Sequence, residues 1–133
     1  MRLDLYLAET RRLAAKQVSL LEQAATRLDR AGELTALEQS GMLHALQVLI
    51  ENAIGKSKHL LKAAGRPVPV SAYDAVKDLI DEGILPGDQQ ARWNAIIGLR
   101  NRIVHDYLNL DVTVVEALVK DRQYQFVADF LQS

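Results

Sequence analysis

The chain has 133 residues, 49% of them hydrophobic, which is the composition of one globular domain over residues 1–133 and argues against intrinsic disorder. It contains no cysteine, which excludes disulfides and thiolate metal sites. The formal net charge of −1 argues against a protein that binds long nucleic acid non-specifically, because such proteins carry an excess of basic residues. Any contact with nucleic acid is therefore expected to be local.

Two long helices are expected in the N-terminal half of the chain. Residues Leu3–Ala31 are rich in Leu, Ala, Arg, Lys and Gln, which favour helix, and their leucines recur at helical spacing. Gly32 ends this helix. The stretch Thr35-Ala36-Leu37-Glu38 has the pattern of a capping box, in which two side chains satisfy free N–H groups at a helix start. We therefore expect a second helix over Ala36–Ala64.

Three shorter helices are expected in the C-terminal half. The Pro-containing stretch Gly65–Pro69 ends the second helix, and Ser71 begins a new cap. Gly83 is a natural end for the third helix, Asp88 is expected to cap the fourth, and Asn109–Asp111 interrupts the chain again. The three helices are predicted over Ala75–Glu82, Gln89–Tyr107 and Val112–Phe130. No segment alternates like a strand, so the predicted fold class is all-α, a bundle of about five helices.

The sequence offers no segment suited to a membrane. No apolar run approaches the roughly 20 residues of a membrane-spanning helix. The N-terminal stretch Met1-Arg2-Leu3-Asp4 has an acidic residue where a secretory signal peptide carries only basic ones. We therefore expect a cytoplasmic protein that makes no contact with a membrane.

The predicted fourth helix carries an unusual residue on its apolar face. On a helical wheel with Trp93 at 0°, Arg100 falls at about 340°, near the middle of the apolar arc. Asn101 and His105 lie together at the edge of that arc, at about 80° and 120°. A guanidinium group stays charged and is costly to bury unpaired, so Arg100 must meet a carboxylate, backbone carbonyls, a second subunit or an anionic ligand.

Two interpretations of Arg100 remain open on these residues alone. The first is structural: Arg100 forms a salt bridge to an acid on a neighbouring helix, such as Glu51, or packs its stem while its head reaches water. The second is functional. An arginine binds phosphate through two parallel hydrogen bonds, and a histidine transfers protons near neutral pH. Together the two residues suit attack of an RNA 2′-hydroxyl on its own phosphate without a metal. Because Arg100 and His105 point about 140° apart on one helix, two copies of the chain would have to face each other to form one cleft.

Several other residues have simpler interpretations. His44 and His59 are interpreted as edge and surface residues rather than metal ligands. Tyr73 and Trp93 are expected to anchor the core or an interface. Gly98 costs its helix about 1 kcal/mol against Ala and is interpreted as allowing close helix approach at a dimer interface.

The stretch around Arg100 resembles a known signature. Arg100-Asn101-(three residues)-His105 is similar to the motif of the HEPN superfamily: an Arg, a polar neighbour, then a His four to six residues on. The longer form, Arg100-x4-His105-x-Tyr107, resembles the HepT toxins in particular. Three further stretches look like the same family: Tyr73–Leu85, Trp93-(six residues)-Arg100 and Leu110-Asp111-Val112. The resemblance covers the C-terminal half by motif and the N-terminal helices by architecture.

This resemblance implies a fold, an activity and partners. HEPN domains are helical bundles that usually form homodimers, and their active ribonucleases use no metal and build one cleft from both protomers. The resemblance implies that Arg100 and His105 are the catalytic pair, that Asn101 is their polar support and that Tyr107 is a modification site. An MntA-type nucleotidyltransferase antitoxin is implied to add AMP to Tyr107. The implied partners are a second copy, that antitoxin and an RNA substrate, with no cofactor and no bound metal.

The first hypothesis is therefore the toxin component of a toxin–antitoxin pair, a metal-independent RNA endonuclease silenced by AMPylation of Tyr107. The alternative is a non-catalytic module that presents Arg100 to a nucleotide or serves as a scaffold for a minimal nucleotidyltransferase. A third possibility is a structural helical dimer in which Arg100 pairs with an acid.

Overall fold

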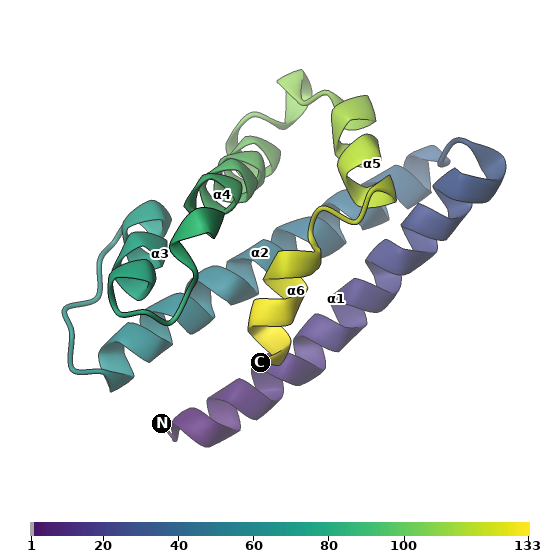
Figure 1. Cartoon of the computed structure of the whole chain (residues 1–133). Coiled ribbons are helices and arrows are strands. Elements are labelled where there is room, and N and C mark those ends of the chain that lie inside the picture. Colours follow the sequence, from purple (N-terminus) through teal and green to yellow (C-terminus); the bar gives the residue numbers. More distant parts are fainter. Residues whose placement is uncertain (1) are drawn as a thin grey trace.

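Two long helices form the frame of the structure, a computed structural model that describes residues 2–133. Helix α1 (Leu3–Ala31) and helix α2 (Ala36–Ala63) run antiparallel along each other (Figure 1). Gly32 ends α1 in the left-handed conformation, with φ of 78°. The Thr35 side chain accepts from the Glu38 backbone N–H, and the Glu38 carboxylate accepts from the Thr35 N–H. The structure thus confirms both predicted helices, and the capping box, to within one residue.

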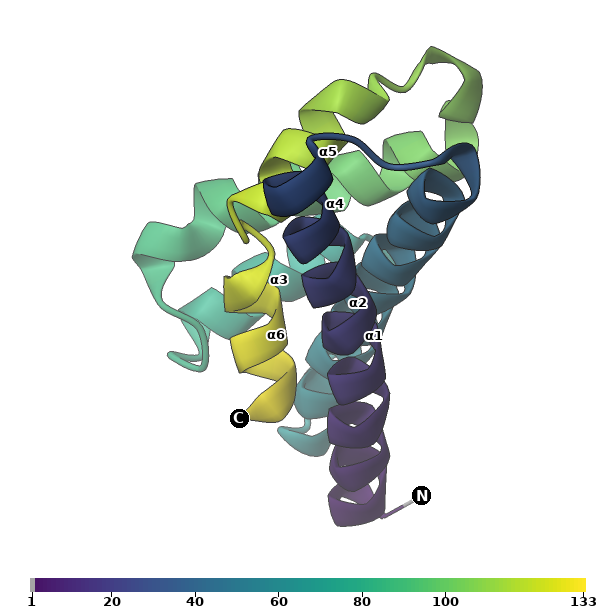
Figure 2. The same cartoon turned by 90° about the vertical axis from the view of Figure 1, so that its right-hand side faces the viewer.

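Four shorter helices pack against this frame. They are α3 (Ala72–Asp81), α4 (Gln90–His105), α5 (Val112–Lys120) and α6 (Gln125–Gln132), with short 3₁₀ turns η1 (Gly87–Gln89) and η2 (Tyr107–Asn109) on either side of α4. Helices α3 and α4 contact α2, whereas α5 contacts α1 and α6 contacts both long helices (Figures 1 and 2). No strand occurs within residues 2–133, which confirms the predicted all-α class, although the described chain has six helices instead of about five.

The start of α3 and the start of α4 both differ from the prediction. The Ser71 hydroxyl accepts from the Asp74 backbone N–H at 3.4 Å, so α3 begins at once after this cap, three residues earlier than predicted. The prediction that Asp88 caps the fourth helix is wrong. Asp88 lies within the 3₁₀ turn η1, and α4 begins after it without a side-chain cap.

The core lies between the long helices and α3 to α6. Its largest fully buried side chains are Trp93 of α4 and Tyr124, which directly precedes α6. The Trp93 ring meets the rings of Phe126 and Phe130 edge to face, at centroid distances of 5.0 and 5.4 Å. This confirms Trp93 as a core anchor and fixes α4 against α6.

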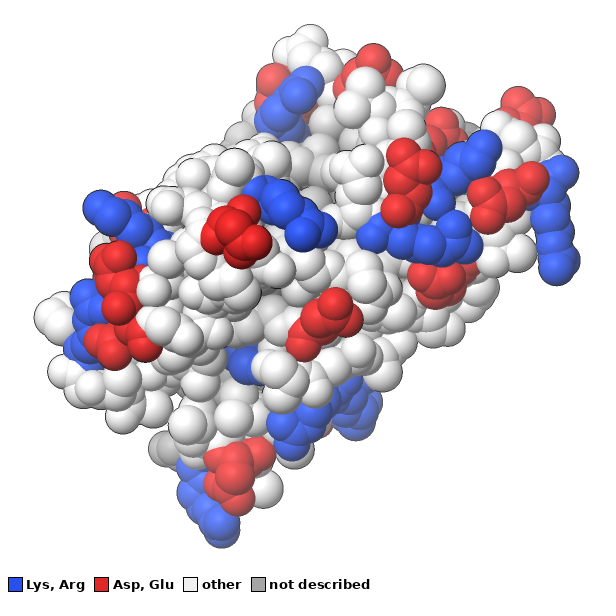
Figure 3. Space-filling view, in the orientation of Figure 1, with Lys and Arg blue, Asp and Glu red and all other residues white. Residues whose placement is uncertain are grey.

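The surface mixes charges of both signs. In the face drawn in Figure 3, Lys and Arg side chains alternate with Asp and Glu side chains, and neither sign covers a continuous area. Within residues 2–133, no helix combines the length and the apolar character needed to cross a membrane.

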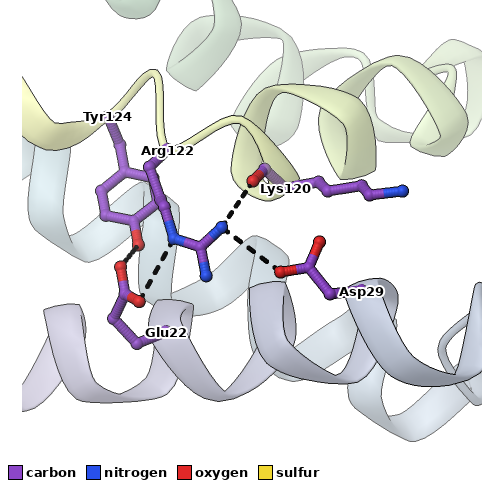
Figure 4. Close-up of polar contacts among 5 residues, drawn as sticks. All are labelled: Glu22, Asp29, Lys120, Arg122 and Tyr124. Carbon is purple, nitrogen blue, oxygen red and sulfur yellow. Dashed lines mark hydrogen bonds and ion pairs between the residues drawn. The ribbon is translucent and has the colours of Figure 1, made fainter.

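The last predicted helix is in fact two helices. The expected single helix over Val112–Phe130 is wrong, because the chain turns between α5 and α6, and Arg122 has a φ of 52° that non-glycine residues rarely adopt. The Arg122 guanidinium donates to Glu22 at 3.3 Å, to Asp29 at 3.5 Å and to the Lys120 carbonyl at 2.8 Å (Figure 4). Contacts with α1 therefore decide the course of a segment whose local pattern is helical.

Candidate active site

The buried face of α4 is interrupted by Arg100. Trp93, Ile96, Ile97 and Ile103 are buried on this helix. Arg100 lies four residues after Ile96 and three before Ile103, so it shares their face and is itself half-buried. The structure thus confirms that an arginine stands among the core residues of α4.

Arg100 has no acidic partner within the described chain. Its Nε atom is buried and donates to no acceptor among residues 2–133. The ion pairs of that part of the chain involve other arginines, and Glu51, the expected partner on α2, is exposed and joins none of them. An internal salt bridge does not explain this residue. A buried N–H group without an acceptor is costly, so the Arg100 Nε calls for an anion, water or groups from another molecule.

Asn101 and His105 lie on the edge of the same helix, one turn apart. The Asn101 side chain is half-buried, and its Nδ2 donates to the Tyr73 hydroxyl of α3 at 3.4 Å. His105 is the last residue of α4 and is exposed, and its ring makes no hydrogen bond within residues 2–133. A histidine with both ring nitrogens free can accept a proton at one and donate one from the other.

The chain leaves the helix directly after His105. Asp106 has φ of −140° and ψ of 38°, and its carboxylate accepts from the Asn109 side chain at 2.7 Å. The predicted helical end at Tyr107 is therefore wrong by two residues, and Tyr107 begins the turn η2 instead. Its side chain is 50% exposed rather than part of the buried face. Tyr107 therefore lies half-exposed in the turn that follows His105.

Apolar side chains are exposed around this turn. Val104, Tyr107, Leu108 and Val114, which we call the apolar corner, belong to the end of α4, to η2 and to the start of α5. Leu108 is 96% exposed and Val114 is 63% exposed. The corner lies at one end of the molecule (Figure 1, top). A hollow of about 370 Å³ adjoins it between α4 and α5, with Arg102 and Leu99 on one wall and Val114 and Leu118 on the other.

The single chain brings together some predicted site residues and not others. Asn101 and His105 share one edge of α4, and Tyr107 follows in the next turn. Five residues apart on α4, Arg100 and His105 are separated by about 140° around an ideal helix axis, so one α4 does not aim both at a single point. Among residues 2–133, no group of three or more His, Cys, Asp or Glu side chains lies close enough to hold a metal ion.

One neighbour of the site was missed by sequence reasoning. The sequence predicts Tyr73 only as an anchor of the core or an interface, yet its hydroxyl accepts from Asn101 and lies 3.5 Å from where a Cβ of Gly98 would be. Gly98 therefore faces α3 of its own chain, a contact that the sequence did not suggest. Tyr73 and Asn101 are 28 residues apart, so no helical spacing could have revealed the contact.

Comparisons with known proteins agree with this geometry. The family model described as "Ribonuclease HepT-like" matches residues 14–133, which include the whole Arg100–Tyr107 motif. A tri-AMPylated HEPN toxin of Shewanella oneidensis, solved with an MNT antitoxin, matches with a TM-score of 0.79 and 17% identity over 96% of each chain. No curated protein matches the chain in sequence.

Two further solved structures are similar. One is a toxin–antitoxin with AMP-PNP, at a TM-score of 0.79 and 17% identity over 95% of this chain and 97% of the other. The other is a mutant MntA-HpeT toxin–antitoxin, at a TM-score of 0.73 and 19% identity over 96% and 97%. These likenesses show a shared fold, that of the HEPN toxins. Because the family model covers most of the chain, including every helix from α2 to α6, the protein belongs to the HepT-like ribonuclease family.

Proposed function

We propose that this chain is the toxin of a toxin–antitoxin pair and that it cuts RNA without a metal, using Arg100 and His105 in a cleft shared by two copies. The observation that carries the proposal is the half-buried Arg100, whose buried Nε finds no acceptor among residues 2–133, on the same helix as the exposed His105. Membership of the HepT-like ribonuclease family supports the reaction class.

In the proposed reaction the RNA supplies its own nucleophile. The 2′-hydroxyl attacks the adjacent phosphorus, the bond from phosphorus to the 5′-oxygen breaks, and the products are a 2′,3′-cyclic phosphate and a 5′-hydroxyl. A neutral His105 accepts the 2′-hydroxyl proton, and the partner subunit's His105, in its protonated form, donates a proton to the departing 5′-oxygen. Arg100 pairs with the phosphate oxygens as negative charge builds up on them.

The need for two copies follows from the geometry of α4. Arg100 and His105 diverge by about 140° on one helix, so a phosphate held by Arg100 of one protomer would meet histidine from the facing protomer. The apolar corner beside the motif provides exposed apolar surface that a second copy would bury. We therefore infer that the active form is a homodimer.

Regulation is proposed to act on Tyr107. Tyr107 is half-exposed and follows His105 by two residues. Transfer of AMP from ATP would join the tyrosyl oxygen to the α-phosphorus, release pyrophosphate and leave a charged nucleotide next to the motif. A cognate nucleotidyltransferase antitoxin of the MntA type would catalyse this transfer. The AMPylated toxin of Shewanella oneidensis, bound to its MNT antitoxin, supports this part of the proposal by analogy.

The central test is cleavage in the presence of EDTA. Purified chain with unmodified Tyr107 is expected to cut total cellular RNA and to leave 2′,3′-cyclic phosphate ends. His105→Ala is expected to abolish cleavage, whereas His44→Ala, at an exposed histidine of α2, retains it. Wild-type protein that leaves every RNA intact would contradict the proposal. If Arg100→Ala then abolished binding of the antitoxin or of a nucleotide, the non-catalytic alternative would stand.

A further inference from the structure

Tyr73 of α3 reaches the edge of α4 that carries the candidate site. Its hydroxyl accepts from Asn101 Nδ2 at 3.4 Å and rests over Gly98, which lies three residues before Asn101. His105 lies four residues after Asn101. Positions three and four apart share one face of a helix, so Gly98, Asn101 and His105 form one row along α4, and the Tyr73 hydroxyl sits at its beginning.

The contact restrains the Asn101 side chain at the edge of α4. An amide has donors on its nitrogen and an acceptor on its oxygen, and the two ends exchange if the group turns over. In the observed hydrogen bond the Tyr73 hydroxyl accepts from the amide nitrogen, and the carbonyl oxygen of Asn101 makes no hydrogen bond among residues 2–133. A free acceptor in that place, one turn from His105, suits the hydroxyl of a ribose.

The position of Tyr73 is itself well defined. The Ser71 cap starts α3 so that Tyr73 falls in its first turn. Ala75, Val76 and Leu79 bury the helix against the core, while the Tyr73 side chain stays 38% exposed at the flank. The phenol therefore contributes its hydroxyl to the neighbouring helix instead of filling the core.

We infer that Tyr73 is a positioning residue of this ribonuclease site, which orients Asn101 so that its carbonyl oxygen accepts from the ribose hydroxyl of the RNA. The inference rests on the proposed function, since it assumes that the row along α4 meets RNA. It adds a residue from α3 to a site otherwise built from the end of α4.

The experiment combines Tyr73→Phe with Asn101→Ala in a double-mutant cycle. The measured quantity is the rate at which 2′,3′-cyclic phosphate ends form on total cellular RNA, with the protein in excess over the RNA. Tyr73→Phe keeps the ring and is expected to slow cleavage about fivefold, the effect of one ordinary hydrogen bond. In the Asn101→Ala background the same substitution should have no further effect, because the amide that Tyr73 orients is gone.

Three controls separate positioning from stability. Tyr6→Phe, at a half-buried tyrosine of α1 outside the site, should retain the wild-type rate. The thermal midpoint of Tyr73→Phe should stay within about 2 °C of wild type. The Asn101 side-chain amide signals in an NMR spectrum should move in Tyr73→Phe and remain in place in Tyr6→Phe.

The outcomes distinguish the two proposals. If the wild type cuts RNA and Tyr73→Phe cuts it equally fast, Tyr73 has no positioning role. Equal slowing by Tyr73→Phe with and without Asn101 would also overturn the inference, because the effect would then not pass through Asn101. If the wild type cuts no RNA, the proposed function fails, and the role assigned to Tyr73 fails with it.

Discussion

The Tyr124 hydroxyl donates a 2.6 Å hydrogen bond to Glu22, which joins the start of α6 to the middle of α1 (Figure 4). The same carboxylate accepts from Arg122, so one acid of α1 holds two residues of the turn between α5 and α6. Tyr124 is fully buried, and this burial raises the pKa of its phenol above the ordinary value of 10.0, with the bond to Glu22 acting in the same direction.

This bond predicts a loss of stability in alkali. Unfolded Tyr124 releases its proton near pH 10.0 while the folded protein keeps it, so the unfolded state is favoured as pH rises above about 10. The bond contributes its full stability below that pH. Tyr124→Phe should cost about 1–2 kcal/mol at pH 7 and should lose less further stability between pH 9 and 11 than wild type does. Urea unfolding at several pH values measures both effects. Parallel alkaline losses in the two proteins would contradict the prediction.

Arg100 predicts an opposition between stability and activity. Because Arg100 is half-buried and has no acidic partner among residues 2–133, replacing it with an apolar side chain removes a partly desolvated charge. Arg100→Leu should raise the free energy of unfolding by up to about 2 kcal/mol and abolish RNA cleavage. The matched control is Arg66→Leu. Arg66 pairs with Glu82 at 3.0 Å and donates to the Asp78 carbonyl at 3.2 Å, so its loss should lower stability by about 1 kcal/mol. Urea titrations decide the point, and a strongly destabilised Arg100→Leu would show that Arg100 holds the fold together.

The apolar corner predicts where two copies meet. Leu108 is 96% exposed beside the motif, and a charge placed there should disrupt a shared cleft. Leu108→Glu is expected to be monomeric by light scattering and to lose cleavage. Leu37→Glu, at a leucine 83% exposed at the start of α2, should remain dimeric and active. A dimeric Leu108→Glu protein would place the interface elsewhere on the surface.

We predict that the antitoxin silences RNA cleavage by modifying Tyr107. When the chain is co-expressed with its nucleotidyltransferase partner, intact mass should show added AMP, and Tyr107→Phe should show none because the accepting oxygen is gone. The partner should then fail to silence the variant, which cuts RNA as the unmodified wild type does. As a control, Tyr6→Phe, at a tyrosine near the start of α1, should still receive AMP on Tyr107. AMP found on Tyr107→Phe would point to another acceptor.

Much of the fold follows from signals that act over one turn of helix. The capping box of Thr35 and Glu38, the stop at Gly32 and the spacing of leucines predicted α1 and α2 to within one residue. The wheel of α4 placed Arg100 among buried residues, and the motif ending at Tyr107 indicated the HepT-like family that the match over residues 14–133 confirms. These features could be predicted because each depends on residues a few positions apart.

Other features of the fold and of the site depend on contacts between residues far apart in the chain. The turn at Arg122 is held by Glu22, which is 100 residues away, and this contact divides a segment that reads locally as one helix. Tyr73 meets Asn101 across 28 residues. The early end of α4 at His105 is a different case, because the contact reported there is local: the Asp106 carboxylate accepts from Asn109, three residues on.

The sequence by itself determined which residues could do chemistry, because residue type and helical spacing are local properties. Only the tertiary structure decided that Arg100 finds no acid, that Asn101 is held from α3 and that Tyr107 faces outward. Those outcomes depend on how helices pack, and packing is determined by the whole set of buried contacts rather than by any one segment.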